Sequence, residues 1–241
     1  MLNSKVIICA GGDGGVNAPN SRWKEKEFSR HMVPIKGIPL IHYIQKQMKD
    51  KGFTDIHVAC DSHNRSKYVL SGIKHIPSPR CFGKFYEHCT VYHYRQFLNK
   101  DGTTVMLYGD TYYTDEFIDA VSKDDGQIFH VYGRHNASDS ITKNDRNNEK
   151  FAYVMHSKDL GRYIKLCETL MPTMEHELQY NYWVQPTCFP QLVYREFSGI
   201  RYNDNRVENK HWIEWNDLTD DFDLGDDWKI KSELFPHIFR K

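Results

Sequence analysis

A glycine-rich turn near the N-terminus combines with two arginines into a candidate phosphate site. The apolar run 5–10 is followed by Gly11, Gly12, Asp13, Gly14 and Gly15, and then by Arg22 and Arg30. Glycines leave backbone N–H groups uncovered and let an anion approach them, while guanidinium groups neutralise its charge. An ordinary strand-to-helix turn with surface arginines is the alternative, and a glycine cluster alone does not exclude it.

A second candidate is Asp110, which follows Gly109 directly after the strongest internal apolar run, 103–108. In open α/β sheets, ligands lie outside the carboxyl ends of the strands, near the point where the strand order reverses. A carboxylate at that place faces any bound phosphates, and a divalent cation such as Mg²⁺ between them would relieve the repulsion. Capping of the helix that follows is an equally good explanation of Asp110 alone.

A third candidate is the acidic segment 220–228, which has five aspartates in eight positions. Such crowding costs electrostatic repulsion, which a metal ion would relieve and which solvent around an exposed loop would also relieve. In an extended segment, Asp221 and Asp223 share one face, whereas Asp226 and Asp227 suit the first turn of a terminal helix. The residues leave these alternatives open.

The elements that must position these candidates alternate between strands and helices. In the first half, apolar spacing predicts strands at 5–10, 55–60 and 103–108, a weaker strand at 73–76, and helices from 40 to near 52, at 84–98 and at 114–121. In the second half it predicts strands at 127–132, 151–155 and 211–215, a loop at 133–150 and a helix at 157–170. This order predicts an α/β fold, with a doubly wound, mostly parallel mixed sheet and helices on both faces.

The composition excludes several classes of protein. Lys plus Arg equals Asp plus Glu at 32 each, so there is no global positive field to hold nucleic acid without sequence preference. The 6 cysteines form no CxxC pair and the 13 histidines no HExxH motif, so we expect free thiols and no dedicated zinc or histidine metal site. No apolar run is long enough to span a bilayer and no cationic leader with an apolar core opens the chain. We therefore expect a cytoplasmic protein without a membrane segment.

Residues 10–12, Arg22, the segment 30–41 and Gly109-Asp110 together resemble the sugar-phosphate nucleotidylyltransferase family, including its molybdenum-cofactor and cytidylyltransferase-like branches. The family signature is a glycine-rich turn, an arginine, and a Pro-Lys pair ahead of a stretch that ends in Gly-x-Pro-Leu. Here Ser29-Arg30 stands where the family has Pro-Lys, and the spacer before it is longer than usual. Arginine keeps the positive charge but does not match a lysine ammonium in shape.

The resemblance implies a Rossmann-like fold of the GT-A and nucleotidyltransferase type in a single domain, 1–241, with an NTP-binding half at 1–122 and an acceptor-binding half at 123–241. It implies transfer of a nucleotidyl group from an NTP to a phosphorylated acceptor, commonly a sugar phosphate, with release of pyrophosphate. The segment 222–228 is similar to a family element whose first aspartate joins the strand-end aspartate on the metal. That match implies Asp110 and Asp223 as ligands of Mg²⁺ or Mn²⁺.

The same resemblance distributes the other roles. Arg22 and Arg30 would act on the triphosphate in catalysis. The nucleotide would contact Ala10, Gly11, Gly12, Asp13, Gly14, Gly15, Gly83 and Asp110. The acceptor would meet side chains of the second half, among them Tyr180, Trp183, Gln185 and Trp212, for which simple core packing is the more frequent use.

Two other functions compete with nucleotidyl transfer. A GT-A glycosyltransferase with a nucleotide-sugar donor shares the fold and the metal, but it would normally carry Asp-x-Asp at the strand end, whereas Thr111-Tyr112 follow Asp110 here. A non-catalytic nucleotide-binding module is favoured by Arg30 in place of lysine and disfavoured by the retention of both aspartates. The base, the acceptor and a possible oligomer stay open.

Overall fold

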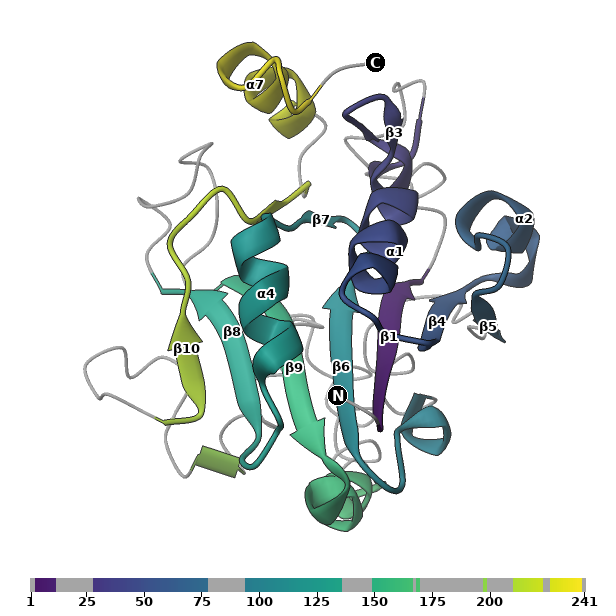
Figure 1. Cartoon of the computed structure of the whole chain (residues 1–241), viewed down its shortest axis with the longest axis vertical. Helices are drawn as coiled ribbons and strands as arrows, with labels where there is room; N and C mark the ends of the chain where they lie inside the picture. The colour runs from purple at the N-terminus through teal and green to yellow at the C-terminus, as the bar shows by residue number, and fades with distance from the viewer. Residues whose placement is uncertain are drawn as a thin grey trace, which may run out of the picture.

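A seven-stranded mixed sheet forms the centre of the molecule (Figure 1). The computed structural model describes residues 3–11, 28–77, 94–135, 149–166, 168–169, 197–198, 210–222 and 226–239. The sheet strands are β1 (Ser4–Ala10), β4 (Asp55–Cys60), β5 (Lys74–Pro77), β6 (Thr103–Tyr108), β8 (His130–Arg134), β9 (Glu149–His156) and β10 (Trp212–Glu214). Their order is β10-β8-β9-β6-β1-β4-β5, and only β9 runs antiparallel to its neighbours. The predicted mostly parallel mixed sheet is confirmed.

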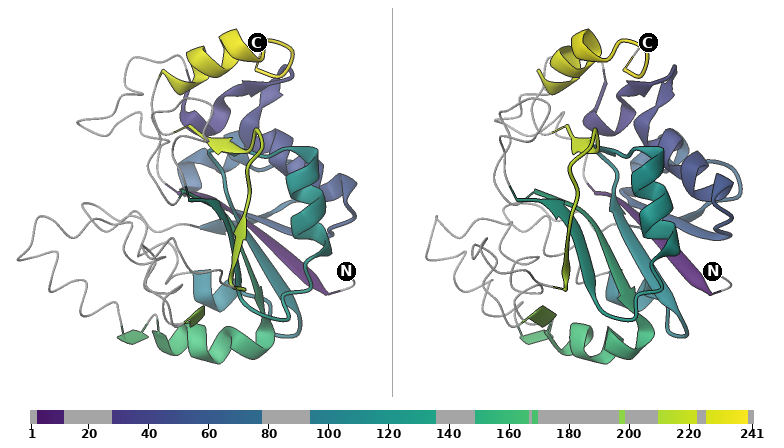
Figure 2. Two further views of the ribbon diagram at one scale, coloured as in Figure 1. Left: turned by 90° about the vertical axis from the view of Figure 1, so that its left-hand side faces the viewer. Right: turned by 60° about the vertical axis from the view of Figure 1, so that its left-hand side comes forward.

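Helices lie on both faces of this sheet. On one face, α1 (Leu40–Asp50) and α4 (Asp115–Lys123) lie side by side (Figures 1 and 2). The apolar positions of α1 that share a face are all buried, namely Leu40, Ile41, Ile44 and Met48. On the other face, the helical segment 160–166 contributes Tyr163 to a second apolar cluster.

The central strand β1 shows why helices must cover both faces of the sheet. Along β1, Val6 and Ile8 pack in the cluster that contains α1 and α4, whereas Ile7 between them packs in the cluster of Tyr163. All three strand side chains are fully buried. A strand with buried apolar side chains on both of its faces is typical of a parallel strand between two layers of helices.

The strand order reverses between β1 and β6. From β1 the chain proceeds outward to β4 and β5, and it then returns across β1 to form β6. The two carboxyl ends are bonded together, because the N–H of Gly109 donates to the carbonyl of Cys9 at 2.8 Å. A Cβ at Gly109 would lie 2.9 Å from the Cβ of Ala10, so only glycine permits this close approach. The edge at Ala10 and Gly109 is therefore the topological switch point of the sheet.

Two short ladders stand above this edge. β7 (Thr111–Tyr112) pairs antiparallel with β11 (Asp220–Asp221), and β2 (Pro34–Ile35) pairs antiparallel with β3 (Ile38–Pro39). The C-terminal helix α7 (Asp227–Leu234) lies beside the β2-β3 ladder (Figure 2). The chain beyond it is bonded to that ladder, since Lys36 N–H donates to the carbonyl of Ile238 at 2.7 Å.

Short helices whose bounds lie within the described residues are α2 (Arg65–Tyr68) and the 3-10 helices η1 (Arg30–Met32), η2 (Ser62–Asn64), η3 (Arg95–Phe97) and η5 (Ser157–Asp159). Thr114 caps α4 as its sequence position suggests, accepting a hydrogen bond from Phe117 N–H at 3.1 Å. In the described part of the chain, no helix is both long and apolar enough to cross a membrane.

The expected loop at 133–150 is wrong at both of its ends. β8 continues through Gly133 to Arg134, and β9 already begins at Glu149. The reason is long-range packing: Arg134 is 1% exposed and pairs with Glu149, and a Cβ at Gly133 would lie 2.6 Å from the Trp212 ring. Most of the helix expected at 84–98 lies outside the described residues.

The expected free thiols are present among the described cysteines. Cys9 and Cys60 form no disulfide. Burial raises the pKa of each of these thiols to about 12, so neither is a reactive thiolate near neutral pH.

Candidate functional site

The structure brings four of the predicted site residues together at the switch point. Ala10 ends β1 and Gly11 follows it, Asp110 comes shortly after β6, and Arg30 reaches the same edge from η1. The other predicted residues lie outside the described part of the chain: Gly12, Asp13, Gly14, Gly15, Arg22, Gly83 and Asp223. The described site therefore consists of one end of the glycine turn, one arginine and one carboxylate.

Arg30 and Asp110 form an ion pair. Arg30 Nε lies 3.0 Å from Asp110 Oδ2, and the two side chains are 31% and 15% exposed. Both side chains keep part of their surface exposed, so a ligand can approach the pair. A phosphate carries the charge that would replace the carboxylate beside the guanidinium, and a cation the charge that would replace the guanidinium beside the carboxylate.

His31 anchors the segment that carries Arg30 in the protein interior. His31 is buried, and its ring meets the ring of Tyr68 edge to face with centroids 5.3 Å apart. The Tyr68 hydroxyl is also hydrogen-bonded to Ser29 Oγ at 3.0 Å. Burial lowers the pKa of His31 and outweighs the opposite effect of Asp110, so the imidazole is neutral near pH 7. The sequence motif contains His31, but its spacing alone assigns this residue no role.

The backbone of Asp110 is fixed from two sides. Next to it, Tyr108 N–H donates to the buried hydroxyl of Tyr113 at 2.8 Å. From the other side, Phe222 N–H donates to the carbonyl of Asp110 at 3.0 Å and continues the β7-β11 ladder. Asp110 thus stands on a rigid frame, directly beside the chain that leads into residue 223.

A buried charge cluster lies next to this frame. Arg134 Nη1 is 3.1 Å from Glu149 Oε2 and 3.2 Å from Asp220 Oδ1, and Lys231 Nζ is 3.1 Å from Asp220 Oδ2. Asp220 is 0% exposed, and Arg134 and Lys231 are each 1% exposed. Burial by itself would lower the pKa of Lys231, but Asp220, Asp221 and Asp227 raise it above its usual value, so the ammonium stays charged.

This cluster corrects the interpretation of Asp220. The sequence predicts that either a metal ion or solvent relieves the electrostatic repulsion within the acidic segment. In the structure, two buried cations contact Asp220 instead. Carboxylate oxygens of Glu149, Asp220 and Asp221 lie within 4.8 Å of one another, a spacing that a cation could also bridge. Arg134 and Lys231 balance two of these three carboxylates, so Asp220 itself is paired with two cations of the protein. No local pattern predicts this cluster, since Arg134 and Lys231 lie in polar segments without a motif.

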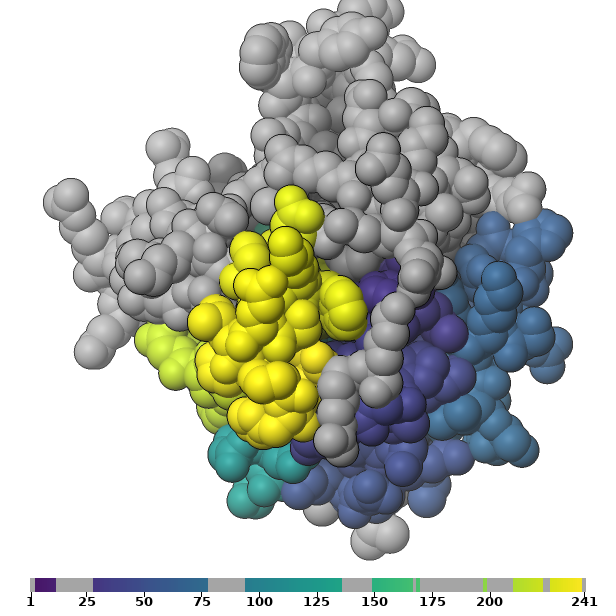
Figure 3. Space-filling view, turned by 90° about the horizontal axis from the view of Figure 1, so that it is seen from above, coloured from purple at the N-terminus to yellow at the C-terminus, as the bar shows by residue number. Residues whose placement is uncertain are grey.

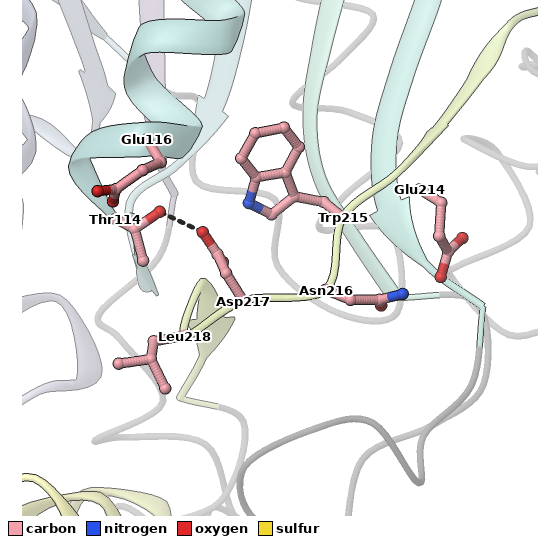
Figure 4. A pocket seen from close by; sticks show the side chains of 7 residues that line it. All are labelled: Thr114, Glu116, Glu214, Trp215, Asn216, Asp217 and Leu218. Atoms are coloured by element: carbon pink, nitrogen blue, oxygen red, sulfur yellow. Dashed lines mark hydrogen bonds between the residues drawn. The ribbon is translucent and has the colours of Figure 1, made fainter.

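A cavity of about 450 Å³ lies between the first turn of α4 and residues 214–218 (Figure 4). Three carboxylates line it, those of Glu116, Glu214 and Asp217, and Asp217 accepts a hydrogen bond from the Thr114 hydroxyl. An acidic lining repels phosphates. Its lining does not include Ala10, Gly11, Arg30 or Asp110, so the cavity is distinct from the switch point.

Trp212, one of the aromatic residues expected at the acceptor, is largely packed. It is 9% exposed, its ring centroid lies 4.3 Å from that of His135, and its indole N–H donates to Glu214 at 2.7 Å. These contacts favour the packing alternative for Trp212. Tyr180, Trp183 and Gln185 lie outside the described residues.

Comparisons with known proteins agree with this architecture. The structure of CTP:phosphocholine cytidylyltransferase from Streptococcus pneumoniae superposes with a TM-score of 0.60 at 15% identity, covering 96% of this chain and 99% of that one. The chain therefore shares the α/β, Rossmann-like fold of that structure. HddC from Yersinia pseudotuberculosis gives a TM-score of 0.49 at 14% identity, over 96% of this chain and 99% of that one.

Sequence similarity to a named protein is confined to a short stretch. Over 59 residues the chain is 39% identical to a "Putative UTP--glucose-1-phosphate uridylyltransferase" of Bacillus subtilis (strain 168). This stretch covers 24% of the present chain and 20% of that relative, so the chain matches about a fifth of the relative's length. No family model matches. The structural likeness confirms the α/β fold that the sequence predicts.

Proposed function

We propose that this chain is a nucleotidylyltransferase, an enzyme that moves an NMP group from an NTP to a phosphorylated acceptor such as a sugar phosphate. The observation that carries the proposal is the exchangeable Arg30–Asp110 pair at the switch point of a nucleotidyltransferase fold. The fold alone would also suit a GT-A glycosyltransferase. The arginine next to the glycine turn favours a triphosphate, which carries more charge than the diphosphate of a nucleotide sugar.

The reaction requires charge neutralisation and alignment more than a protein nucleophile. An oxygen of the acceptor phosphate forms a bond to the α-phosphorus of the NTP, and the bond to the bridging oxygen of pyrophosphate breaks. The acceptor is already ionised, so no general base is needed. Arg30 would leave Asp110 and bind phosphate oxygens, with Arg22 beside it, and the N–H groups of the glycine turn would cradle the chain of phosphates.

The residues present fit a divalent cation. Asp110 offers a hard oxygen ligand at a partly exposed position of the switch point. Phe222 donates its N–H to the carbonyl of Asp110, and Asp223 is the next residue in the sequence. Asp110 and Asp223 would hold Mg²⁺ or Mn²⁺, which when bound offsets the repulsion between carboxylates and phosphates. The proposal includes a cytoplasmic location, because NTPs and sugar phosphates are found there.

Pyrophosphate release tests the proposed function. The protein is incubated with each NTP and Mg²⁺, together with a panel of sugar 1-phosphates and phosphocholine. We expect pyrophosphate only when one particular NTP and one acceptor are both present. Chelation of the metal should abolish release, and added Mn²⁺ should restore it. Absence of pyrophosphate with every pair, combined with hydrolysis of a nucleotide sugar, would instead identify a glycosyltransferase.

A further inference from the structure

Lys231 of α7 contacts three consecutive residues that lead toward Asp223. Its ammonium lies 3.1 Å from Asp220 Oδ2, donates to the carbonyl of Asp221, and stands 4.4 Å from the centre of the Phe222 ring. The side chain is 1% exposed. A buried ammonium costs several kcal/mol of desolvation unless carboxylates and acceptors surround it, which these contacts provide.

The three residues that Lys231 holds are those that join the acidic segment to Asp110. Asp220 and Asp221 form β11, which pairs with Tyr112 and Thr111 of β7. Phe222 is fully buried and donates its N–H to the carbonyl of Asp110 at 3.0 Å. A shift of Lys231 would therefore move the strand that ends beside Asp110.

α7 also contacts the segment that carries Arg30. The Trp228 ring meets the ring of Phe28 edge to face, with centroids 5.3 Å apart. Seen from above, α7 (yellow) lies against the N-terminal half of the chain (purple to blue) (Figure 3). The helix thus touches both sides of the candidate site, the arginine side through Trp228 and the carboxylate side through Lys231.

We propose that Lys231 is a positioning residue for the metal site. By fixing Asp220, Asp221 and Phe222, whose N–H is bonded to the carbonyl of Asp110, it holds Asp110 in place. This inference rests on the proposed function, because it assigns Lys231 to the placement of Asp110 as a proposed metal ligand. It adds a role for α7 beyond covering the core.

The test compares Lys231→Met with Lys229→Met, which removes an exposed ammonium from the same helix. One readout is the affinity for Mn²⁺ alone, measured from the electron paramagnetic resonance of the free ion. The other is the hydrogen exchange rate of the Phe222 amide, relative to the amides of β1 and β6. We expect Lys231→Met to weaken Mn²⁺ binding about tenfold, as loss of a residue behind a ligand typically does. The Phe222 amide should exchange faster while the β1 and β6 amides keep their protection.

The two proposals fail in different ways. Equal Mn²⁺ affinity in the wild type and Lys231→Met, or uniformly faster exchange across the sheet, would overturn the positioning role alone. Absence of Mn²⁺ binding in the wild type would overturn the proposed metal site, and the positioning role with it. If Lys231→Met does not fold, Lys231→Arg decides, since it keeps the charge but cannot place its nitrogens where the ammonium lies. Weakened Mn²⁺ binding in that variant supports the role, and unchanged binding contradicts it.

Discussion

Two carboxylates of this molecule, Asp110 and Asp220, contact cations in opposite surroundings. Asp110 is 15% exposed and pairs with the single guanidinium of Arg30. Asp220 is 0% exposed and lies between Arg134 and Lys231, each 1% exposed. Loss of one partner from a fully buried pair costs about 3–5 kcal/mol, and a pair that keeps access to solvent costs less to break. We therefore expect the first carboxylate to change partners during a reaction and the second to keep them.

The two carboxylates are also connected through backbone hydrogen bonds. Asp220 pairs with Tyr112 in the β7-β11 ladder, which begins one residue after Asp110. The same ladder continues into the bond from Phe222 N–H to the Asp110 carbonyl. The buried charge cluster around Asp220 thus supports the segment that carries the Arg30–Asp110 ion pair. A group of neighbouring acidic residues does not by itself locate a metal site.

The largest expected effect is on stability. Asp220→Asn leaves Arg134 and Lys231 buried with one negative charge fewer, so we expect the free energy of unfolding to fall by about 3–5 kcal/mol. Urea denaturation measures this value. Asp119→Asn, at an exposed pair with Lys51, is the matched control and should leave the unfolding midpoint unchanged. An unfolding midpoint for Asp220→Asn equal to that of Asp119→Asn would show that the buried cluster does not stabilise the fold.

The next effect is on turnover with little effect on stability. Asp110→Ala removes the proposed metal ligand, and we expect pyrophosphate release to fall at least about hundredfold, equivalent to about 2.7 kcal/mol. The same variant should lose no more than about 1 kcal/mol of folding stability, because only a partly exposed pair is broken. Activity that survives this substitution would mean that the metal assignment is wrong.

Local sequence patterns predicted most of the elements that bear the site. The helix from Leu40, the Thr114 cap and the Gly109-Asp110 strand end all follow from signals within a few residues of one another. Adjacency of the β1 and β6 ends could also be predicted, because the order of strands and helices restricts the possible sheets. Assignment of Asp223 as a ligand stays a prediction, since this residue lies outside the described part of the chain.

The buried cluster could not be predicted in this way. Arg134, Asp220 and Lys231 come from three separate elements, and none of them stands in a pattern that indicates burial. Only the packing of β8, β11 and α7 reveals that two cations, not solvent or a metal, neutralise Asp220. The same packing extends β8 to Arg134, beyond the point where local apolar alternation ends.

The distinction between the two carboxylates is tested most directly by locating Mn²⁺ in crystals grown with a non-hydrolysable NTP analogue. The anomalous signal is predicted to lie about 2.1 Å from a carboxylate oxygen of Asp110, with Asp223 as the second protein ligand and Arg30 moved onto a phosphate. A manganese ion among Glu149, Asp220 and Asp221, with Asp110 still paired to Arg30, would contradict the account.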